Sequence, residues 1–209
     1  MIPCLALLER KFVLPRCQIE KVEMIFTPTK LKLAWIVDVE RREDHRGFFA
    51  RSFCVSEFRD HGLDVRVAQI NLGYTAKKGS LRGLHYQLAP HQETKIVRCT
   101  RGAIFDVAVD LRVDSPTFKH WIGRELTAQD HRLLVVPEGC AHGYQALEDA
   151  TEVEYLTSAA YAPDAARGVR HDDPSFEIEW PLPVEAISDA DKTWPDFQDC
   201  MVEVRDSRS

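Results

Sequence analysis

Short runs of apolar and β-branched residues recur along the chain from residue 31 onward, at intervals of about 8–15 residues. Gly, Pro, Asp and Lys-Gly pairs separate these runs, as in KKGS at 77–80. This rhythm predicts an antiparallel sandwich or barrel rather than alternating β-α units. Besides SLRGLHYQ at 80–87, the expected strands are 31–39, 47–53, 65–75, 94–112, 120–127, 132–137, 140–148 and 151–161.

Two short helices are expected outside the strands. The stretch SEFRDHGL predicts a helix over 56–63 that Gly62 closes, and a second helix is expected near 192–200. After Tyr161 the pattern loosens into Pro, Asp and Ala, which is typical of a tail that wraps a barrel. The sequence contains no internal repeat and no low-complexity segment.

The two chain ends are expected to lie outside the folded domain. A regular pattern begins at Met24, so we expect residues 1–23 to be an N-terminal extension, 24–200 a single domain and 201–209 a C-terminal tail. The apolar run CLALL at 4–8 is broken at once by Glu9 and two basic residues, which makes it a poor signal peptide. No stretch approaches the length of a membrane span.

The composition narrows the classes of partner. The chain has 209 residues and a net charge of -6, which argues against nucleic acid or an anionic membrane as the partner. The 6 cysteines are scattered, with no CxxC pair and no zinc-like spacing. Free thiols in a reducing cytoplasm are therefore expected.

The stretch VVPEGCAHGYQ at 135–145 resembles the second half of the cupin signature, PxGxxH, in which a turn delivers a histidine into the mouth of a jelly-roll barrel. A metal-binding cupin also needs a first histidine cluster, and the corresponding stretch here offers His85 with Lys95 further on. A lysine opposes a divalent cation electrostatically. His91 and Glu93 keep a metal site open as the weaker alternative.

Without a metal, the same residues suggest acid–base chemistry on an organic substrate. His85 is suited to remove a proton near neutral pH, and the Lys95 ammonium can hold the oxyanion that forms when a proton next to a carbonyl leaves. Tyr155 could return the proton on the opposite face, or could be an ordinary half-buried strand residue. Asp189 and Asp191 are candidates to fix the histidine tautomer if the tail folds back over the barrel.

Several separated motifs together resemble the dTDP-4-dehydrorhamnose 3,5-epimerases. They are DHRGFF at 44–49, SLRGLHYQ at 80–87, TKIVRCTRGAIFDVAVDLR at 94–112, DSPTF at 114–118, VPEGCAHGYQ at 136–145, the DDP…W segment at 172–180 and ISDAD at 187–191. The resemblance covers about residues 31–195. It implies an all-β, cupin-like jelly roll with a few short helices, a cytoplasmic homodimer, no metal and no other cofactor. It also implies epimerisation at C3 and C5 of a nucleotide-linked, dTDP-type 4-keto-6-deoxyhexose for rhamnose-type deoxysugars of cell-surface polysaccharides.

The family's site residues carry over motif by motif. By this resemblance the catalytic set is His85 as the base, Lys95 at the enolate, Tyr155 as the opposite acid and Asp191 as the partner of the base. The implied substrate contacts are Arg46, Gln69, Asn71, Arg82 and His142. The chain departs from the family pattern at Arg51, at Ala166 with Arg167 beside it, and at Ala190. These departures suggest that the reaction is kept while the sugar or nucleotide preference differs.

Three alternatives to the double epimerase stay open on the sequence. One is a single-centre epimerase that inverts only C3 or only C5 of a dTDP-, CDP- or GDP-linked 4-keto sugar. The others are a metal-dependent cupin oxygenase and a catalytically silent cupin that binds a sugar nucleotide.

Overall fold

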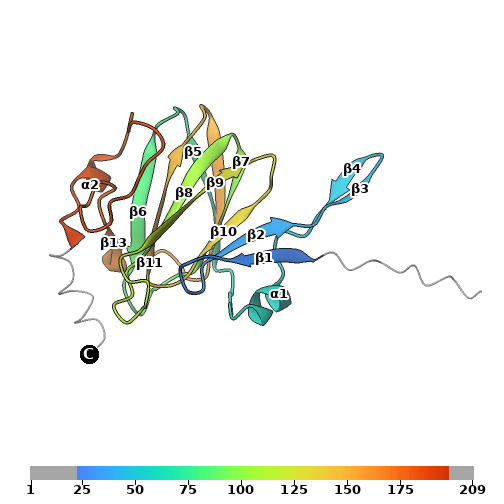
Figure 1. The fold of residues 1–209 in the computed structure, drawn as a ribbon, viewed down its shortest axis with the longest axis horizontal. Coiled ribbons are helices and arrows are strands. Elements are labelled where there is room, and N and C mark those ends of the chain that lie inside the picture. Colours follow the sequence, from blue (N-terminus) through green and yellow to red (C-terminus); the bar gives the residue numbers. More distant parts are fainter. Residues whose placement is uncertain (1–22, 198–209) are drawn as a thin grey trace, which may run out of the picture.

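The computed structural model describes residues 23–197, which form two antiparallel β-sheets packed face to face (Figure 1). One sheet has the order β1 (Met24–Pro28), β2 (Trp35–Val39), β10 (Leu133–Val136), β7 (Lys95–Arg101), β12 (Thr151–Thr157), β5 (Gln69–Thr75). The other has the order β13 (Ala166–Gly168), β6 (Leu81–Gln87), β11 (Cys140–Ala146), β8 (Ala103–Asp110), β9 (Trp121–Thr127). The predicted all-β, jelly-roll architecture is confirmed.

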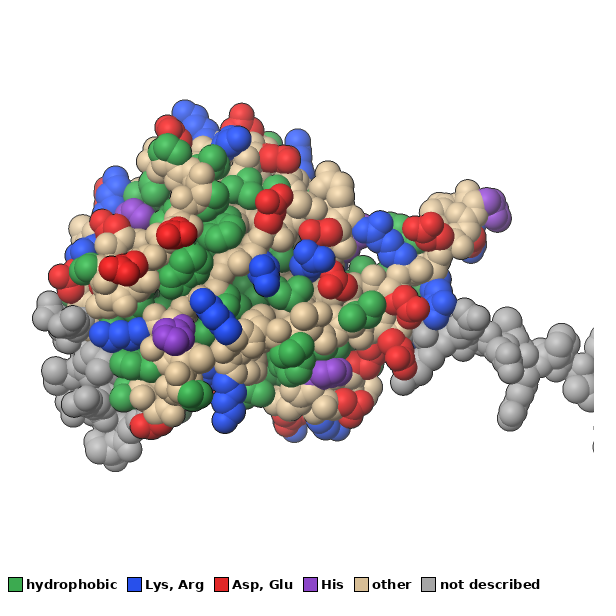
Figure 2. Space-filling view, viewed as in Figure 1, with side chains coloured by type: hydrophobic (Ala, Val, Ile, Leu, Met, Phe, Trp, Pro, Cys, Tyr) green, Lys and Arg blue, Asp and Glu red, His purple; other side chains and the backbone are tan. Residues whose placement is uncertain are grey.

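The remaining elements are small. Strands β3 (Arg42–Asp44) and β4 (Gly47–Phe49) pair as a separate hairpin that stands clear of the double sheet (Figures 1 and 2). The helices are α1 (Val55–Asp60), the single 3₁₀ turn η1 (Pro163–Ala165) and α2 (Asp189–Lys192). No helix in the described part of the chain is long and apolar enough to cross a membrane.

Several predicted boundaries were wrong, each for a local reason. The expected strand over 94–112 is two strands, because Gly102 adopts φ +75° and turns the chain between β7 and β8. The apolar residues before Trp35 form a turn rather than a strand. In the stretch before Gln69, Val65 is buried and Val67 is exposed, and only the Ala68 amide bonds the neighbouring strand, at the Thr157 carbonyl (2.8 Å). The helix α2 over Asp189–Lys192 was not expected, and the helix expected near 192–200 falls partly outside the described residues. The extension expected at 1–23, except for residue 23, and the tail expected at 201–209 also lie outside them, so these expectations stay predictions.

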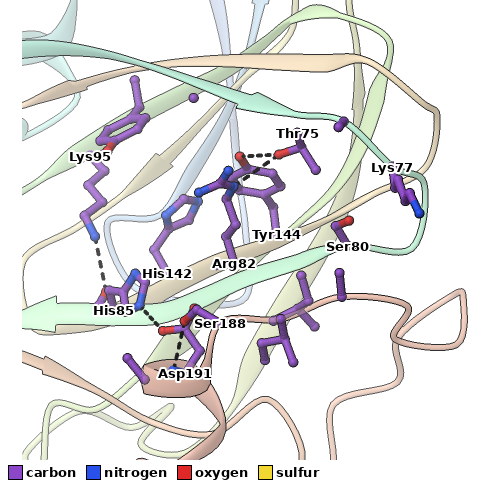
Figure 3. A pocket seen from close by; sticks show the side chains of 18 residues that line it. Thr75, Lys77, Ser80, Arg82, His85, Lys95, His142, Tyr144, Ser188 and Asp191 are labelled. Carbon is purple, nitrogen blue, oxygen red and sulfur yellow. Dashed lines mark hydrogen bonds and ion pairs between the residues drawn. The ribbon is translucent and has the colours of Figure 1, made fainter.

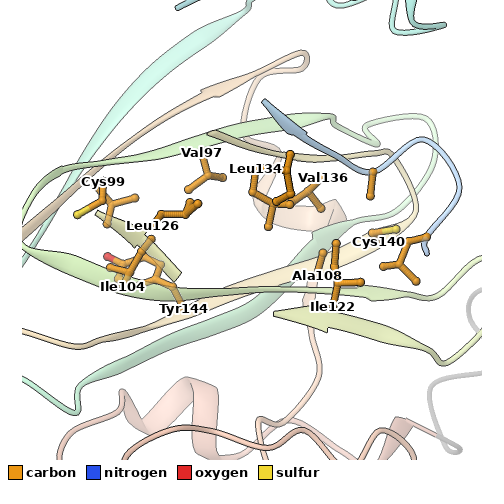
Figure 4. Packing of buried hydrophobic residues seen from close by; sticks show 14 residues of the cluster. Val97, Cys99, Ile104, Ala108, Ile122, Leu126, Leu134, Val136, Cys140 and Tyr144 are labelled. Carbon is orange, nitrogen blue, oxygen red and sulfur yellow. The ribbon is translucent and has the colours of Figure 1, made fainter. Parts of the chain in front are cut away.

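The space between the sheets is filled by apolar side chains that alternate along facing strands. The six-stranded sheet contributes Val97 and Leu134, and the five-stranded sheet contributes Ile104 and Leu126, all fully buried (Figure 4). This core occupies only part of the interior. At one end of the sandwich the inward positions carry polar side chains instead.

Part of the outer face of each sheet is also buried, which explains why several strands have continuous apolar runs. Helix α1 places Phe58 over Val37 and Val135 of the six-stranded sheet. The tail after β12 crosses the other sheet and packs Val169, Phe176 and Phe197 onto it. The predicted wrapping of the tail is confirmed.

Candidate active site

A pocket of about 780 Å³ opens between the two sheets at their polar end. Volumes of this order are typical of small-molecule sites. It is lined by residues from β5, β6, β7, β11 and β12 and by the segment that carries α2 (Figure 3). Of the residues predicted for the site, it brings together Arg82, His85, Lys95, His142, Tyr155 and Asp191.

An irregularity in β6 turns two of these side chains into the same cavity. His85 lies opposite His142 and Arg82 lies opposite Tyr144, so three steps on β6 match two steps on β11. An extra residue of this kind is a β-bulge, which redirects side chains that strict alternation would place on opposite faces. The bulge depends on Gly83, which has φ +108° and whose added Cβ would lie 2.7 Å from the carbonyl oxygen of His142.

His85 is paired with Asp191 although 106 residues separate them. Its Nε2 lies 2.6 Å from Asp191 Oδ1, while Asp191 Oδ2 accepts a bond from the Gly83 amide at 3.3 Å. Burial acts to raise the pKa of Asp191, but the bonds from His85 and Gly83 and the charge of His85 outweigh it and hold this pKa below its usual value. An ionised Asp191 keeps the proton on Nε2, which leaves Nδ1 of His85 free of a proton, as a base requires.

The N-cap of α2 fixes the position of Asp191 beside His85. Ser188 caps the helix by accepting a bond from the Asp191 amide at 3.1 Å, which fixes the first turn. The neighbouring candidate, Asp189, is exposed and lies 3.8 Å from Lys192. Asp191, and not Asp189, is therefore the carboxylate that contacts His85.

Lys95 and Tyr155 enter the pocket from the sheet that faces His85. They lie on the adjacent strands β7 and β12 of the six-stranded sheet, whereas His85 belongs to the five-stranded sheet. The Lys95 ammonium bonds the backbone carbonyl of His85 at 3.2 Å and lies 3.3 Å from Glu93 Oε1. Burial raises the pKa of Tyr155, which keeps its phenol protonated and able to donate. A carboxylate-paired histidine and a protonated tyrosine thus line opposite walls of one cavity.

His142 has a buried partner that the sequence analysis did not single out. Its Nε2 lies 2.8 Å from Asp106 Oδ1, and the Asp106 side chain is fully buried. The signal was present in the strand AIFDVAVD, because a carboxylate within an apolar run must find a partner to be buried. Asp106 does not line the pocket, but its bond to His142 fixes the orientation of that ring.

Arg82 is held by two further residues that were not predicted. Its Nε donates to Thr75 Oγ1 at 3.2 Å and its Nη2 to the Tyr74 carbonyl at 2.9 Å. The hydroxyls of Thr75 and Tyr144 lie 3.2 Å apart, so the arginine, threonine and tyrosine form one chain along the pocket wall (Figure 3). A fixed guanidinium at the wall suits an anionic substrate group.

Three predicted substrate contacts do not line this pocket. Arg46 sits at the turn of the β3–β4 hairpin, 78% exposed and paired with Asp44. Gln69 accepts a bond from the Tyr161 amide at 2.9 Å, and Asn71 lies opposite Tyr155 in the β5–β12 ladder. Their roles stay predictions.

The residues that depart from the family pattern lie in different parts of the structure. Arg51 pairs with Glu57 at 2.9 Å beside α1, and Ala166 begins β13 opposite Gln87. Only Ala190 lines the pocket, next to Asp191. Among the described residues, no group of three or more His, Cys, Asp or Glu side chains is placed to hold a metal ion.

The profile of one family, dTDP-4-dehydrorhamnose 3,5-epimerase, matches residues 28–199. The chain belongs to this family. A relative named dTDP-4-dehydrorhamnose 3,5-epimerase from Shigella flexneri is 45% identical over 157 residues, which are 75% of this chain and 86% of the relative. The resemblance inferred from the separated motifs is confirmed.

Solved structures and a further relative extend the comparison. The crystal structure of the dTDP-4-dehydrorhamnose 3,5-epimerase of Bacillus anthracis with TDP and pyrophosphate bound superposes with a TM-score of 0.80 at 38% identity, covering 83% of this chain and 99% of that one. A dTDP-4-dehydrorhamnose 3-epimerase from Streptomyces niveus is 37% identical over 81% of this chain and 82% of its own length. The family's similar members therefore include single-centre as well as double epimerases.

Proposed function

We propose that this epimerase inverts both C3 and C5 of a dTDP-linked 4-keto-6-deoxyhexose. The observation that carries the proposal is the pocket in which a carboxylate-paired histidine faces a lysine and a protonated tyrosine from the opposite sheet. The isomerase activity predicted from the sequence follows from membership of the family.

The geometry supports a two-step proton transfer. His85 Nδ1 removes a proton from the carbon next to the C4 carbonyl, and the electron pair moves onto the carbonyl oxygen to form an enolate. The Lys95 ammonium stabilises that oxygen. Tyr155 then protonates the carbon from the other face, so the carbon is inverted and the C4 ketone returns. Because C3 and C5 flank the same carbonyl, one set of groups serves both carbons.

Incubation with dTDP-4-keto-6-deoxyglucose in deuterated water, followed by proton NMR, tests this function. We expect deuterium at both C3 and C5 without any added cofactor. Deuterium at one carbon only would establish the single-centre alternative instead. Absence of exchange at both carbons, in a protein that binds dTDP, would contradict the epimerase assignment and favour a silent binding protein.

Replacing Tyr155 by Phe should separate exchange from inversion. His85 can still remove the proton, but the acid on the opposite face is gone, so the enolate regains a proton on the face from which it was lost. We expect the epimerised product to form about 10²-fold more slowly, with deuterium exchange reduced much less. The NMR assay above reads both quantities. Equal loss of exchange and inversion would contradict the role of Tyr155 as the opposite acid.

We also propose that the protein is a homodimer. The outer face of edge strand β5 exposes Ile70, Leu72 and Tyr74, with Ile70 63% and Leu72 68% exposed. An edge strand with such a stripe is an association surface. The protruding hairpin adds exposed Phe48 and Phe49. A second copy would cover these residues.

A dimer would also explain how Arg46 can take the substrate-binding role that the sequence predicts. Because the hairpin stands away from this chain's own pocket (Figure 1), Arg46 would contact the substrate of the other copy. We expect hybrid dimers of Arg46→Ala and His85→Asn subunits to regain activity, because the Arg46→Ala subunit's pocket keeps its base and receives Arg46 from its partner. A 23.9 kDa monomer in light scattering would contradict the dimer. Hybrids without recovered activity would contradict the shared site.

The substrate class supports the predicted setting. We infer a cytoplasmic enzyme that supplies deoxysugars for cell-surface polysaccharides, and the cysteines Cys54, Cys99 and Cys140 are free thiols, as is typical of a reducing compartment.

A further inference from the structure

Glu93 is a nearly buried carboxylate that pairs with Lys95, a residue of the pocket, and that the reaction above does not use. It precedes β7 by two residues, and its side chain is 11% exposed. Its Oε1 lies 3.3 Å from the Lys95 ammonium, whose own side chain is 10% exposed. Two opposite charges in such a position stabilise each other far more than a surface pair would.

The second oxygen of Glu93 is held from β6. Gln87 Nε2 donates to Glu93 Oε2 at 3.2 Å. Gln87 is itself fixed, because it is buried, donates to the His91 carbonyl at 2.9 Å and accepts from the Ala162 amide at 2.6 Å. The carboxylate is therefore anchored on one side and presented to Lys95 on the other.

Lys95 is in turn fixed by two acceptors. Its ammonium donates to the His85 carbonyl and to Glu93, which uses two of the three donors of an ammonium group. The third donor is available for the oxygen of a bound substrate. Without Glu93, the Lys95 ammonium would be held only by the neutral carbonyl of His85, and the flexible four-carbon side chain could move.

We propose that Glu93 is a positioning residue for the epimerisation, fixing Lys95 in the pocket as an ammonium. The inference rests on the proposed function, because Lys95 matters as an ammonium only if an oxyanion forms beside it. Glu93 also adds negative charge near Tyr155, so one carboxylate favours the protonated form of both groups that the enolate step requires.

The charges around these groups agree with this role. Burial lowers the pKa of Lys95, and the charge and hydrogen bond of Glu93 oppose that change, with a smaller contribution from Asp106. Burial raises the pKa of Tyr155, the charge of Glu93 adds to the rise and the charge of Arg82 opposes it. The other ionisable side chains that line the pocket are Lys77, the pair His85–Asp191, the Tyr144 phenol and His142, which is bonded to the buried Asp106.

The sign of the pH effect follows from these directions. Both Lys95 and Tyr155 must carry a proton to act. Removing the charge of Glu93 lowers the pKa of each, so each loses its proton at a lower pH. The alkaline limb of the kcat profile should therefore move to lower pH, while a purely structural role would leave the limb in place.

The test compares Glu93→Gln and Glu93→Asp with Glu154→Gln as the matched control. Glu154 is also a paired carboxylate, 2.7 Å from Arg98, but it lies outside the pocket. For Glu93→Gln we expect the alkaline limb of the kcat profile to move to lower pH by about one pH unit or more. We also expect kcat at neutral pH to drop about 10-fold, with KM nearly unchanged. Glu93→Asp keeps the negative charge, so its alkaline limb should lie close to the pH of the wild-type limb. The control should match the unchanged protein.

Two results would overturn the proposal. One is an unchanged alkaline limb in Glu93→Gln, and the other is a displaced limb that Glu93→Asp does not restore at all. If Glu93→Gln fails to fold, kcat of Glu93→Asp decides. The shorter side chain should hold Lys95 less well and lower kcat at an unchanged alkaline limb, and an unchanged kcat would overturn the proposal. Failure of the proposed function is distinguishable, since the unchanged protein would then show no exchange at any pH.

Discussion

Replacing His85 by Asn is expected to lower kcat by about 10²–10⁴-fold, the usual contribution of a general base. The physical reason is that asparagine has no basic nitrogen to accept the carbon-bound proton. Because His85 is about half exposed in an open pocket, its loss should leave the fold intact. The exchange of C3 and C5 protons in deuterated water measures the effect, and binding of dTDP by calorimetry should change little.

The pattern of the loss at His85 carries more information than its size. If one base serves both carbons, exchange at C3 and at C5 must fall by the same factor. Exchange at one carbon that persists at the unchanged rate would contradict this mechanism and point to a second base, for which His142 is the nearest candidate in the pocket. His120→Asn, an exposed histidine outside the pocket, is the matched control and should retain full activity.

Replacing Lys95 by Met is the second large effect that we expect. Loss of a preorganised oxyanion donor lowers kcat by about 10²–10³-fold. The same change leaves the Glu93 carboxylate nearly buried without its cation, which should lower the free energy of unfolding by up to about 3 kcal/mol. Activity comes from the NMR assay and stability from urea unfolding.

A double variant separates these two consequences. In Lys95→Met with Glu93→Gln, no buried charge is left unpaired, so we expect the free energy of unfolding to recover while kcat stays low. Recovery of kcat in the double variant would contradict the role of Lys95 at the enolate oxygen, because activity would then follow stability alone. Lys32→Met, which removes an exposed lysine, controls for the loss of one positive charge.

The relative sizes of these effects follow from what each group does. In the proposed mechanism His85 takes part in breaking the C–H bond, Lys95 stabilises the charge that results, and Glu93 acts only through Lys95 and Tyr155. The expected losses in kcat therefore decrease in that order. The double-variant comparison applies to any pair in which one charge is catalytic and the other holds it.

The architecture was accessible from the sequence because it depends on local rules. Alternating apolar runs separated by turn residues predict antiparallel strands, and the recurring pattern placed most of them. The exceptions were places where the local signal is ambiguous. Gly102 divides β7 from β8, the short strands β1, β3 and β13 were not predicted, and the strand expected over 65–75 begins only at Gln69.

The chemistry of single residues was likewise predictable in part. His85, Lys95 and Tyr155 have side chains whose reactivity suits proton transfer next to a carbonyl, and the motifs around them matched one family. Asp106 could have been added from its position in an apolar strand. Glu93 appeared in the sequence only as a weak metal candidate, because nothing local shows that its carboxylate reaches Lys95.

Only the tertiary structure decided which of these groups meet. Residue chemistry alone left Asp189 and Asp191 as partners for the base, and the family motif favoured Asp191. The contact itself depends on the tail that crosses the five-stranded sheet and on Ser188, which caps α2. The bulge at Gly83 likewise brings Arg82 and His85 to one cavity against strict alternation. Contacts between residues about 100 positions apart depend on packing energies summed over the whole fold, so residue types and spacing determine the chemistry that is available, and the packing decides which side chains share the pocket.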